Sequence, residues 1–523
     1  MKRLSPRSRF FAASAVLLAA SAAVDALVLS LSKIAWTSDQ AVVGLMARHI
    51  LKNGEHPVFY WGSGYAGSIE PHLLAGLFAL LGPTLFAYRL GMVLFLLAGV
   101  ALTTAAARRM FGDSCALFTL AVLAVPPFAF LSKGLTSDGA YDALLFLTTL
   151  ILWTAFEAER RLAHGRPAVA LFATMGLSAG LGFWLDPLIA IPAVAVLLWF
   201  SAVRRAVFRR PRELCAFIAG LAAGVAPVLV HFLRHGGTDV ADAGRFVFPL
   251  TFDSWLSQAR LLWSRGIPIW MGGREIYHSA DSFRGAGLIA ILIFLIPAAA
   301  AGIAVARRRP EARALALLLA ALACAFVLLP FHRGVPWLEV RYLFALTGAQ
   351  ALLLGWSLAS LFGRSRRLAA VALAAALAWN AASIARAPKT DSVAYKPDHG
   401  SVAALTASLE AAGIHSVYSS YWIAYRLDFE SGEKIIAAQD PVPQYGSGWL
   451  VRYAYYFGPV DSDPRPAVLL SGDDAVVFRR GMRNGGFSFR EVPASPFSIF
   501  TDLDPRILAQ IRQTHHIPYR KPG

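Results

Sequence analysis

Long apolar runs restrict what this sequence can fold into more than any other feature. About eleven stretches are long and apolar enough to cross a bilayer as helices. They lie near 10–32, 84–107, 114–131, 139–156, 168–184, 186–203, 213–233, 284–306, 312–330, 338–362 and 367–387. Only 15% of the 523 residues are charged, whereas soluble domains carry about a quarter. The sequence therefore predicts a polytopic α-helical membrane protein with about eleven transmembrane helices.

Clusters of basic residues separate many of these runs. The formal net charge of +17 would suit a nucleic-acid-binding protein, but the arginines stand in short groups between apolar runs, which is typical of cytoplasmic loops. The groups lie at 2–9, 108–109, 160–166, 204–212, 307–313 and 364–367. All of them fall on one side of the membrane if the N-terminus is cytoplasmic. We predict a multi-pass membrane protein with a cytoplasmic N-terminus that binds no nucleic acid.

The opposite side of the membrane then receives the segments that are not especially basic. These include two long outer loops, 33–83 and 234–283, and everything after about residue 388. We predict a transmembrane domain at 1–387 and a small extracytoplasmic α/β domain at 388–523. In the latter, 401–412 has helical periodicity and ends at Gly413. Strand-like segments follow at 415–422, 434–439, 466–471 and 487–492.

The cysteine pattern gives no sign of a cofactor. Cys115, Cys215 and Cys324 all lie within apolar runs, without paired spacing or histidine partners. They are expected to be buried thiols, because neither a disulfide framework nor a metal-binding spacing is present. No cofactor is predicted with certainty, and a divalent cation held by carboxylates is left open.

The first outer loop carries the most unusual combination of residues. It begins W-T-S-D-Q, with Asp39, and later reads Y-W-G-S-G-Y-A-G-S-I-E, which ends at Glu70. Carboxylates beside glycines that admit a ligand suit acid–base chemistry or cation binding. Each acid also has a structural explanation: Ser38 or Asp39 as the N-cap of an amphipathic surface helix over 39–51, and Glu70 at the start of a helix.

The order of these motifs resembles that of the GT-C glycosyltransferases, integral-membrane enzymes that use polyprenyl-phosphate sugars. The resemblance covers most of the chain. Its elements are Asp39, the stretch Y-W-G-S-G-Y-A-G-S-I-E, L-L-A-G-L-F-A-L-L-G, A-A-R-R-M-F-G, G-L-G-F-W-L-D-P-L, V-R-Y-L-F-A-L and, in the tail, Y-W-I-A-Y-R-L-D-F-E-S-G-E. It implies a GT-C-like fold and transfer of a sugar from a polyprenyl-phosphate donor, usually with inversion, to a lipid, glycan or protein acceptor at the outer face of the bilayer.

The resemblance also implies roles for individual residues. Asp39 matches the first-loop aspartate and is the expected general base, and Glu70 matches the acid that closes this loop. Pro71 and His72 follow Glu70 where the family usually has Lys-Pro, so a lysine contact to the donor phosphate is missing there. Asp142 is the third expected catalytic carboxylate. The donor phosphate is assigned to Arg341, with Arg333, His332 and Lys133, and the substrate-lining side chains to Tyr60, Trp61 and Tyr65.

Structural explanations and other functions stay open for several of these features. Ser137 or Asp138 is a competing helix cap near Asp142, and Arg341 is equally typical of an arginine that reaches lipid head groups. Asp186 is interpreted as a helix-initiating residue before Pro187. Asp25, inside the first apolar run, is a costly position for a charge. A transporter and a non-catalytic GT-C-like protein that binds lipid or assists assembly are the alternative functions.

Overall fold

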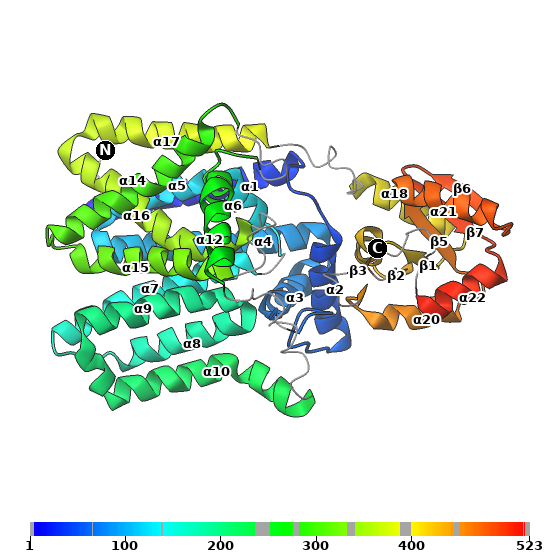
Figure 1. The fold of residues 1–523 in the computed structure, drawn as a ribbon, viewed down its shortest axis with the longest axis horizontal. Coiled ribbons are helices and arrows are strands. Elements are labelled where there is room, and N and C mark those ends of the chain that lie inside the picture. Colours follow the sequence, from blue (N-terminus) through cyan, green and yellow to red (C-terminus); the bar gives the residue numbers. More distant parts are fainter. Residues whose placement is uncertain are drawn as a thin grey trace. The chain divides into compact units, whose positions relative to one another are not determined.

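A computed structural model of the chain describes residues 5–64, 66–137, 140–235, 251–275, 282–331, 340–387, 399–440, 442–443, 449–515 and 517. Every predicted apolar run coincides with a helix or a pair of helices (Figure 1). In chain order they are α1 (Pro6–Ser30), α4 (Leu85–Phe111), α5 (Asp113–Ala124) with α6 (Phe128–Gly134), α7 (Tyr141–Ala163), α8 (Val169–Leu185), α9 (Ala190–Val203), α10 (Pro211–His235), α14 (Ala286–Ala306), α15 (Ala312–Leu328), α16 (Phe344–Arg364) and α17 (Arg366–Arg386). The predicted helical membrane protein is confirmed.

The helices differ in how well they suit a membrane crossing. Within the described residues, eight are long and apolar enough to span a bilayer, and nine are if the bent pair α5–α6 is one span. The helix α8 and the segment 187–203, which includes α9, are shorter apolar helices. The full number of spans therefore stays a prediction.

The third predicted run is not one straight helix. The axes of α5 and α6 differ by 80°, and the break falls at Val125, Pro126 and Pro127. Val125 has a φ of −132° and a ψ of 74°, outside the helical region. A proline lacks the amide hydrogen that a helix needs and disfavours helical geometry in the residue before it. The two prolines thus end α5 and let α6 leave in a new direction.

Ion pairs bring several of the basic clusters to one end of the helices. Glu157 of α7 pairs with Arg109 of α4 at 3.1 Å. Glu159, two residues further along α7, pairs with Arg204 after α9 at 3.1 Å and with Arg313 of α15 at 2.7 Å. Three basic clusters that lie far apart in the sequence therefore meet at the same end of α7, as the alternation of loops predicts.

Close helix packing in this region depends on glycine. Gly176 and Gly180 of α8 lie against Gly220 and Gly224 of α10, and a Cβ at Gly180 would lie 2.4 Å from the carbonyl oxygen of Leu221. Small residues let two membrane helices approach at backbone distance, which gains dispersion contacts where no hydrophobic effect operates. The outer side of α10 remains exposed. Cys215 on α10 is consequently exposed, contrary to the prediction, whereas Cys115 and Cys324 are buried, and all three thiols are free.

The chain divides into two compact units. The first, called the membrane unit here, comprises Met1–Leu31, Gly64–Ile69 and Leu90–Ala387; the second, called the loop–tail unit, comprises Ser32–Ser63, Glu70–Arg89 and Pro388–Gly523. The loop–tail unit thus contains most of the first outer loop together with the tail. The predicted division into domains at 1–387 and 388–523 stays a prediction.

The first-loop helix is buried instead of lying on the surface. The helix α2 (Ser38–Asn53) is buried at almost every position from Ser38 to His49, although its sequence predicts an amphipathic surface helix. It packs against α19 (Tyr421–Glu430) of the same unit, where a Cβ at Gly44 would lie 2.6 Å from the ring of Phe429. The polar side of α2 is covered because α19 supplies polar partners for it, which the sequence of the loop cannot reveal.

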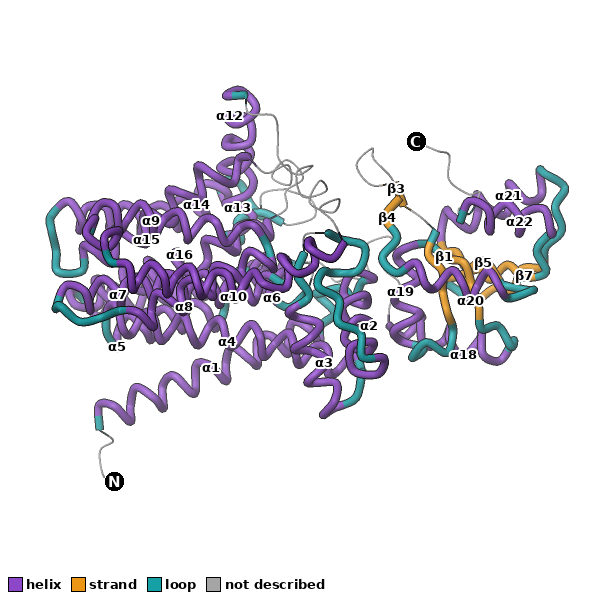
Figure 2. Tube along the Cα trace, turned by 90° about the horizontal axis from the view of Figure 1, so that it is seen from below, coloured by secondary structure: helices purple, strands orange, loops and turns teal. Residues whose placement is uncertain are grey.

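The tail contains a five-stranded sheet, and in the described chain the strands lie only there (Figure 2). Its order is β2-β1-β5-β7-β6, with β1 parallel to β2 and β5, and β7 antiparallel to β5 and β6. The strands are β1 (Ser416–Ser419), β2 (Ile436–Gln439), β5 (Ala467–Ser471), β6 (Arg490–Ala494) and β7 (Phe497–Thr501); β3 (Val442–Pro443) and β4 (Trp449–Leu450) form a separate pair. The predicted small α/β domain is confirmed in its fold class.

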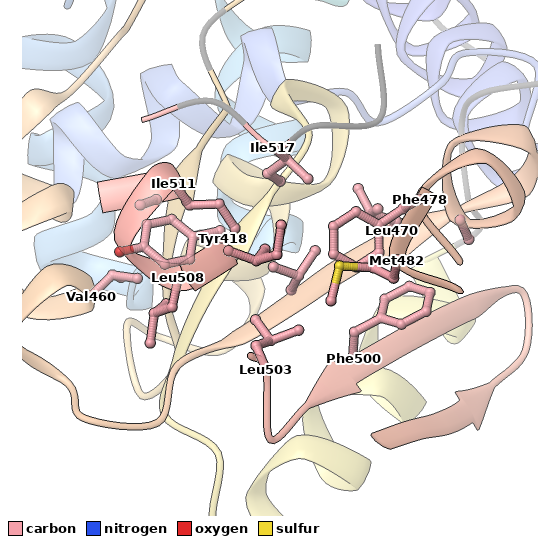
Figure 3. Close-up of a cluster of buried hydrophobic side chains, with 14 of the residues drawn as sticks. Tyr418, Val460, Leu470, Phe478, Met482, Phe500, Leu503, Leu508, Ile511 and Ile517 are labelled. Atoms are coloured by element: carbon pink, nitrogen blue, oxygen red, sulfur yellow. The ribbon is translucent and has the colours of Figure 1, made fainter. Parts of the chain in front are cut away.

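Helices cover both faces of this sheet because its central strands alternate between two apolar cores. One core joins Tyr418, Val468 and Phe500 to α20 (Phe457–Ser462), α21 (Gly472–Asn484) and α22 (Pro505–Thr514) (Figure 3). The other joins Val417 and Leu469 to α18 (His399–Ala411) and α19. The tail is therefore a three-layer α/β/α arrangement.

The predicted elements of the tail differ from the observed ones at their boundaries. The first predicted strand, 415–422, ends at Ser419, and Tyr421 and Trp422 begin α19. Ser420, a favoured N-cap residue, has extended backbone angles there. The predicted strand at 487–492 is shifted to β6, and β7 was not predicted. The apolar pattern fixes which segments are ordered, whereas tertiary pairing sets their ends.

Candidate functional site

Asp39 lies in the first turn of α2 and is held by side chains of the tail. Its Oδ1 accepts a hydrogen bond from the hydroxyl of Tyr421, which begins α19. The same oxygen lies 3.5 Å from Nη2 of Arg452, an ion pair in which the Asp39 side chain is 30% exposed and that of Arg452 is 16% exposed. Thr37, not Ser38 or Asp39, is the N-cap residue of α2. The carboxylate of Asp39 is thus not used for helix capping.

The aromatic part of the first loop surrounds the same group. The hydroxyl of Tyr60 donates a hydrogen bond to the backbone carbonyl of Asp39, and the guanidinium of Arg452 lies 4.8 Å from the Tyr60 ring centroid. Gly62, with a φ of +66°, turns the chain so closely past the tail that a Cβ there would lie 2.4 Å from the carbonyl oxygen of Val451. Glycine at this position therefore allows the backbone of the first loop to contact the backbone of the tail.

Trp61, the next residue after Tyr60, is buried in an aromatic cluster with Tyr453 and His49. It is 8% exposed and stacks on Tyr453 at a centroid distance of 3.9 Å and edge-on to His49 at 5.0 Å. The Trp61 side chain therefore packs against two protein rings. Its predicted contact with the sugar stays a prediction.

His49 is enclosed by two carboxylates. Its Nδ1 lies 2.7 Å from Glu55 and its Nε2 lies 2.7 Å from Glu433. Only the protonated imidazolium can donate from both nitrogens. Burial lowers the pKa of His49, but the hydrogen bonds to Glu433 and Glu55 outweigh it and raise the pKa above 6.5. Burial raises the pKa of Glu433, and its bonds from His49 and Tyr456 outweigh that and lower the pKa below 4.5.

This cluster predicts how the stability of the loop–tail unit depends on pH. Since the folded pKa of His49 is raised, its contribution is complete below pH 6.5 and is lost as the pH rises through the folded pKa. Since the folded pKa of Glu433 is lowered, its contribution is present above pH 4.5 and is lost as the pH falls through the folded pKa. The melting temperature in detergent should peak between these two values.

A His49→Gln variant should remove the alkaline part of this dependence. Each charge-assisted hydrogen bond of His49 is worth about 1.5–3 kcal/mol. The titratable or charged side chains that face this histidine or its partners are Glu55, Glu433, Arg48, Tyr453 and Tyr456. His164, an exposed histidine of the membrane unit, provides the control variant His164→Gln. A melting profile that falls with rising pH as much in His49→Gln as in the wild type would contradict the assignment.

Glu70 lies in the first turn of α3 (Ile69–Leu81) and is 2% exposed. This is the position that its structural explanation requires, since the amides of a helix N-terminus favour a negative charge. Its predicted catalytic role stays a prediction.

The membrane unit brings together a second group of predicted residues. Asp142 is buried in the first turn of α7, where its Oδ1 accepts a hydrogen bond of 2.7 Å from the amide of Ala143. The N-cap position of α7 is Ala140, and Asp138, one of the two predicted caps, lies outside the described residues. Arg341, in the short helix η7 (Val340–Leu343), lies 6.0 Å from the ring of Tyr141, the neighbour of Asp142. The predicted phosphate ligand therefore lies near the first turn of α7, in which the third predicted carboxylate also lies.

Three further residues of the membrane unit have clear positions. Asp186 accepts a hydrogen bond of 2.8 Å from the amide of Leu188 and is the N-cap of the short helix η1 (Pro187–Ile189), which confirms its helix-initiating role. Arg341 also acts electrostatically on Asp186. Lys133 lies in the last turn of α6. Asp25 is buried within α1, and its Oδ2 has no hydrogen-bond partner among the described residues.

Three predicted site residues, Tyr65, His332 and Arg333, lie outside the described residues. No group of three or more His, Cys, Asp or Glu side chains is placed to hold a metal ion in the part of the chain that is described. A divalent cation therefore stays an open prediction.

Arg452 and Tyr421 were not predicted from the sequence as site residues. Tyr421 opens the tail motif Y-W-I-A-Y-R-L-D-F-E-S-G-E, so its presence in that motif was an available signal. Arg452 lies in L-V-R-Y-A-Y-Y-F, a segment with no pattern that would single it out.

The described chain contains a bundle of apolar helices of membrane-spanning length and a small sheet domain, and its fold is similar to that of solved glycosyltransferase structures. The family model described as dolichyl-phosphate-mannose-protein mannosyltransferase matches residues 69–231, less than half of the chain. ArnT from Cupriavidus metallidurans, in a structure bound to undecaprenyl phosphate, matches with a TM-score of 0.63 and 13% identity, over 93% of this chain and 97% of that chain.

A second solved structure has the same type of fold. The oligosaccharyltransferase of Archaeoglobus fulgidus, in complex with Zn and sulfate, matches with a TM-score of 0.52 and 12% identity, over 87% of this chain and 68% of that chain. No curated protein matches the chain. At these identities the likeness is one of fold, and it confirms the predicted resemblance to GT-C enzymes at that level.

Proposed function

We propose that this protein is a glycosyltransferase that moves a sugar from a polyprenyl-phosphate donor to an acceptor at the outer face of the bacterial inner membrane. The observation that carries the proposal is the fold match to ArnT bound to undecaprenyl phosphate, which extends over 93% of this chain. The gathering of basic clusters at one end of the helices supports a cytoplasmic N-terminus and an extracytoplasmic tail.

The proposed reaction gives each predicted catalytic or phosphate-binding residue a separate chemical role. Asp39 takes the proton of an acceptor hydroxyl as its oxygen attacks the anomeric carbon. The bond from this carbon to the phosphate oxygen breaks, and the electron pair leaves on polyprenyl phosphate. Arg341 stabilises the charge released on that phosphate, with Lys133 as a further cation. Attack opposite to the leaving group inverts the anomeric configuration.

The direct test uses purified full-length protein in lipid nanodiscs with a panel of polyprenyl-phosphate sugars and candidate acceptors. We expect acceptor-dependent release of free polyprenyl phosphate and a product of inverted anomeric configuration, measured by mass spectrometry and NMR. A panel that yields no release, while the same donors cross the bilayer of proteoliposomes, would favour a transporter and overturn the proposed function.

A further inference from the structure

The tail holds only one oxygen of the Asp39 carboxylate. Tyr421 and Arg452 both act on Oδ1, and Nε of Arg452 also donates to the Tyr421 hydroxyl at 3.2 Å. No described residue donates a hydrogen bond to Oδ2 of Asp39, and the side chain is 30% exposed. The carboxylate is thus fixed from one side, and its second oxygen is accessible.

Arg452 is itself held from several directions. Its backbone amide donates to the hydroxyl of Tyr425 at 2.9 Å and to Oε1 of Gln439 at 3.3 Å. Its Nη1 lies 3.5 Å from the carbonyl oxygen of Trp61, and its guanidinium lies over the ring of Tyr60. Burial lowers the pKa of Arg452, but Tyr421, Tyr60 and Asp39 outweigh it, so the pKa is raised and the side chain is a permanent cation.

We propose that Arg452 is a positioning residue for Asp39, acting directly and through the hydroxyl of Tyr421. This rests on the proposed function, in which Asp39 takes a proton from the acceptor. A base accelerates proton transfer only if it lies within hydrogen-bond reach in the right orientation. Fixing Oδ1 presents Oδ2 to the acceptor hydroxyl, so the tail completes the site of the first loop without touching the reacting atoms.

The proposal predicts a specific kinetic pattern for Arg452→Ala. We expect kcat to fall about 10- to 100-fold, because small misplacements of a catalytic group have effects of this size. The donor KM should change by less than about twofold, because the variant removes no contact that holds the donor equally in the ground state and the transition state. Arg452→Lys should recover part of the loss because it keeps the charge, and Tyr421→Phe should lose part of kcat. Arg465→Ala, at an exposed tail arginine, is the matched control.

A double-mutant cycle separates positioning from a general effect on folding. If Arg452 acts through Asp39, then Arg452→Ala should cost no further activity in an Asp39→Asn background. The same cycle on melting temperature in detergent should also be non-additive, since it measures the contact without catalysis. Additive losses of activity in an active enzyme would overturn the positioning role and leave the proposed function intact.

The remaining outcomes are also distinguishable. Additive changes in melting temperature would show that the two side chains are not coupled and would overturn the proposal at the level of the contact. Coupled melting temperatures, together with a wild type that releases no polyprenyl phosphate from any donor, would overturn the proposed function and with it the positioning role.

Discussion

Asp39→Asn is expected to slow the release of polyprenyl phosphate by about 10²- to 10⁴-fold, the range over which a general base contributes. The amide oxygen of asparagine still accepts the hydrogen bond of Tyr421, so the local packing should survive, whereas the group can no longer take a proton. Single-turnover release of polyprenyl phosphate from a donor that the wild type uses, measured in nanodiscs, reports the sugar-transfer step separately from product dissociation.

The control for this variant is Asp113→Asn. Asp113 is an exposed carboxylate that pairs with Arg108 at the surface of the membrane unit, and its loss should leave the rate unchanged. Full activity of Asp39→Asn, in a preparation with the melting temperature of the wild type, would show that another group is the base. Inactivity of the wild type and both variants alike would point to a non-catalytic protein.

Arg426→Met is expected to destabilise the loop–tail unit by about 3–5 kcal/mol, the usual cost of removing one partner of a buried ion pair. The side chains of Arg426 and Glu430 are 1% and 4% exposed, and their ion pair measures 3.1 Å. Glu430 also accepts a hydrogen bond of 3.0 Å from the indole of Trp36 in the first loop. Unfolding followed by tryptophan fluorescence measures the loss.

Two further variants show whether the cost comes from the loss of the ion pair. The double variant Arg426→Met with Glu430→Leu removes both charges and should recover most of the stability, because apolar groups of similar volume often replace a buried pair at little cost. Removing the exposed partner Arg108 in Arg108→Met should cost less than about 1 kcal/mol. An equal loss in the single and double variants would mean that packing, and not charge, explains the effect.

The transmembrane part could be predicted well from the sequence because its physics is local. In a bilayer each helix must satisfy its own backbone hydrogen bonds, so an apolar run of sufficient length is enough to identify it. The grouping of Arg109, Arg204 and Arg313 on one side follows from the same alternation. The bend of 80° at Pro126 and Pro127 was not predicted, because the run 114–131 was interpreted as one span.

The candidate site was predicted only in part. Asp39 stood out as a carboxylate in a glycine-rich loop beside an apolar run, and Asp142 was assigned through the resemblance to GT-C enzymes; the structure shows where each one lies. Arg452 did not stand out, since it lies 413 residues from Asp39 in the sequence and nothing in its segment indicates the contact. A long-range pair of this kind leaves no periodic signal in either partner.

What the sequence determined by itself is the class of the protein: membrane helices with one basic side, an acidic and glycine-rich first loop, and an α/β tail. These follow from hydropathy, charge and periodicity, which act over one or two turns of chain. Only the tertiary structure decided that α2 is buried, that α19 covers it, and that Tyr421 and Arg452 hold Asp39. The reason is that burial and ion pairing depend on which distant segments pack together, and local patterns do not encode that choice.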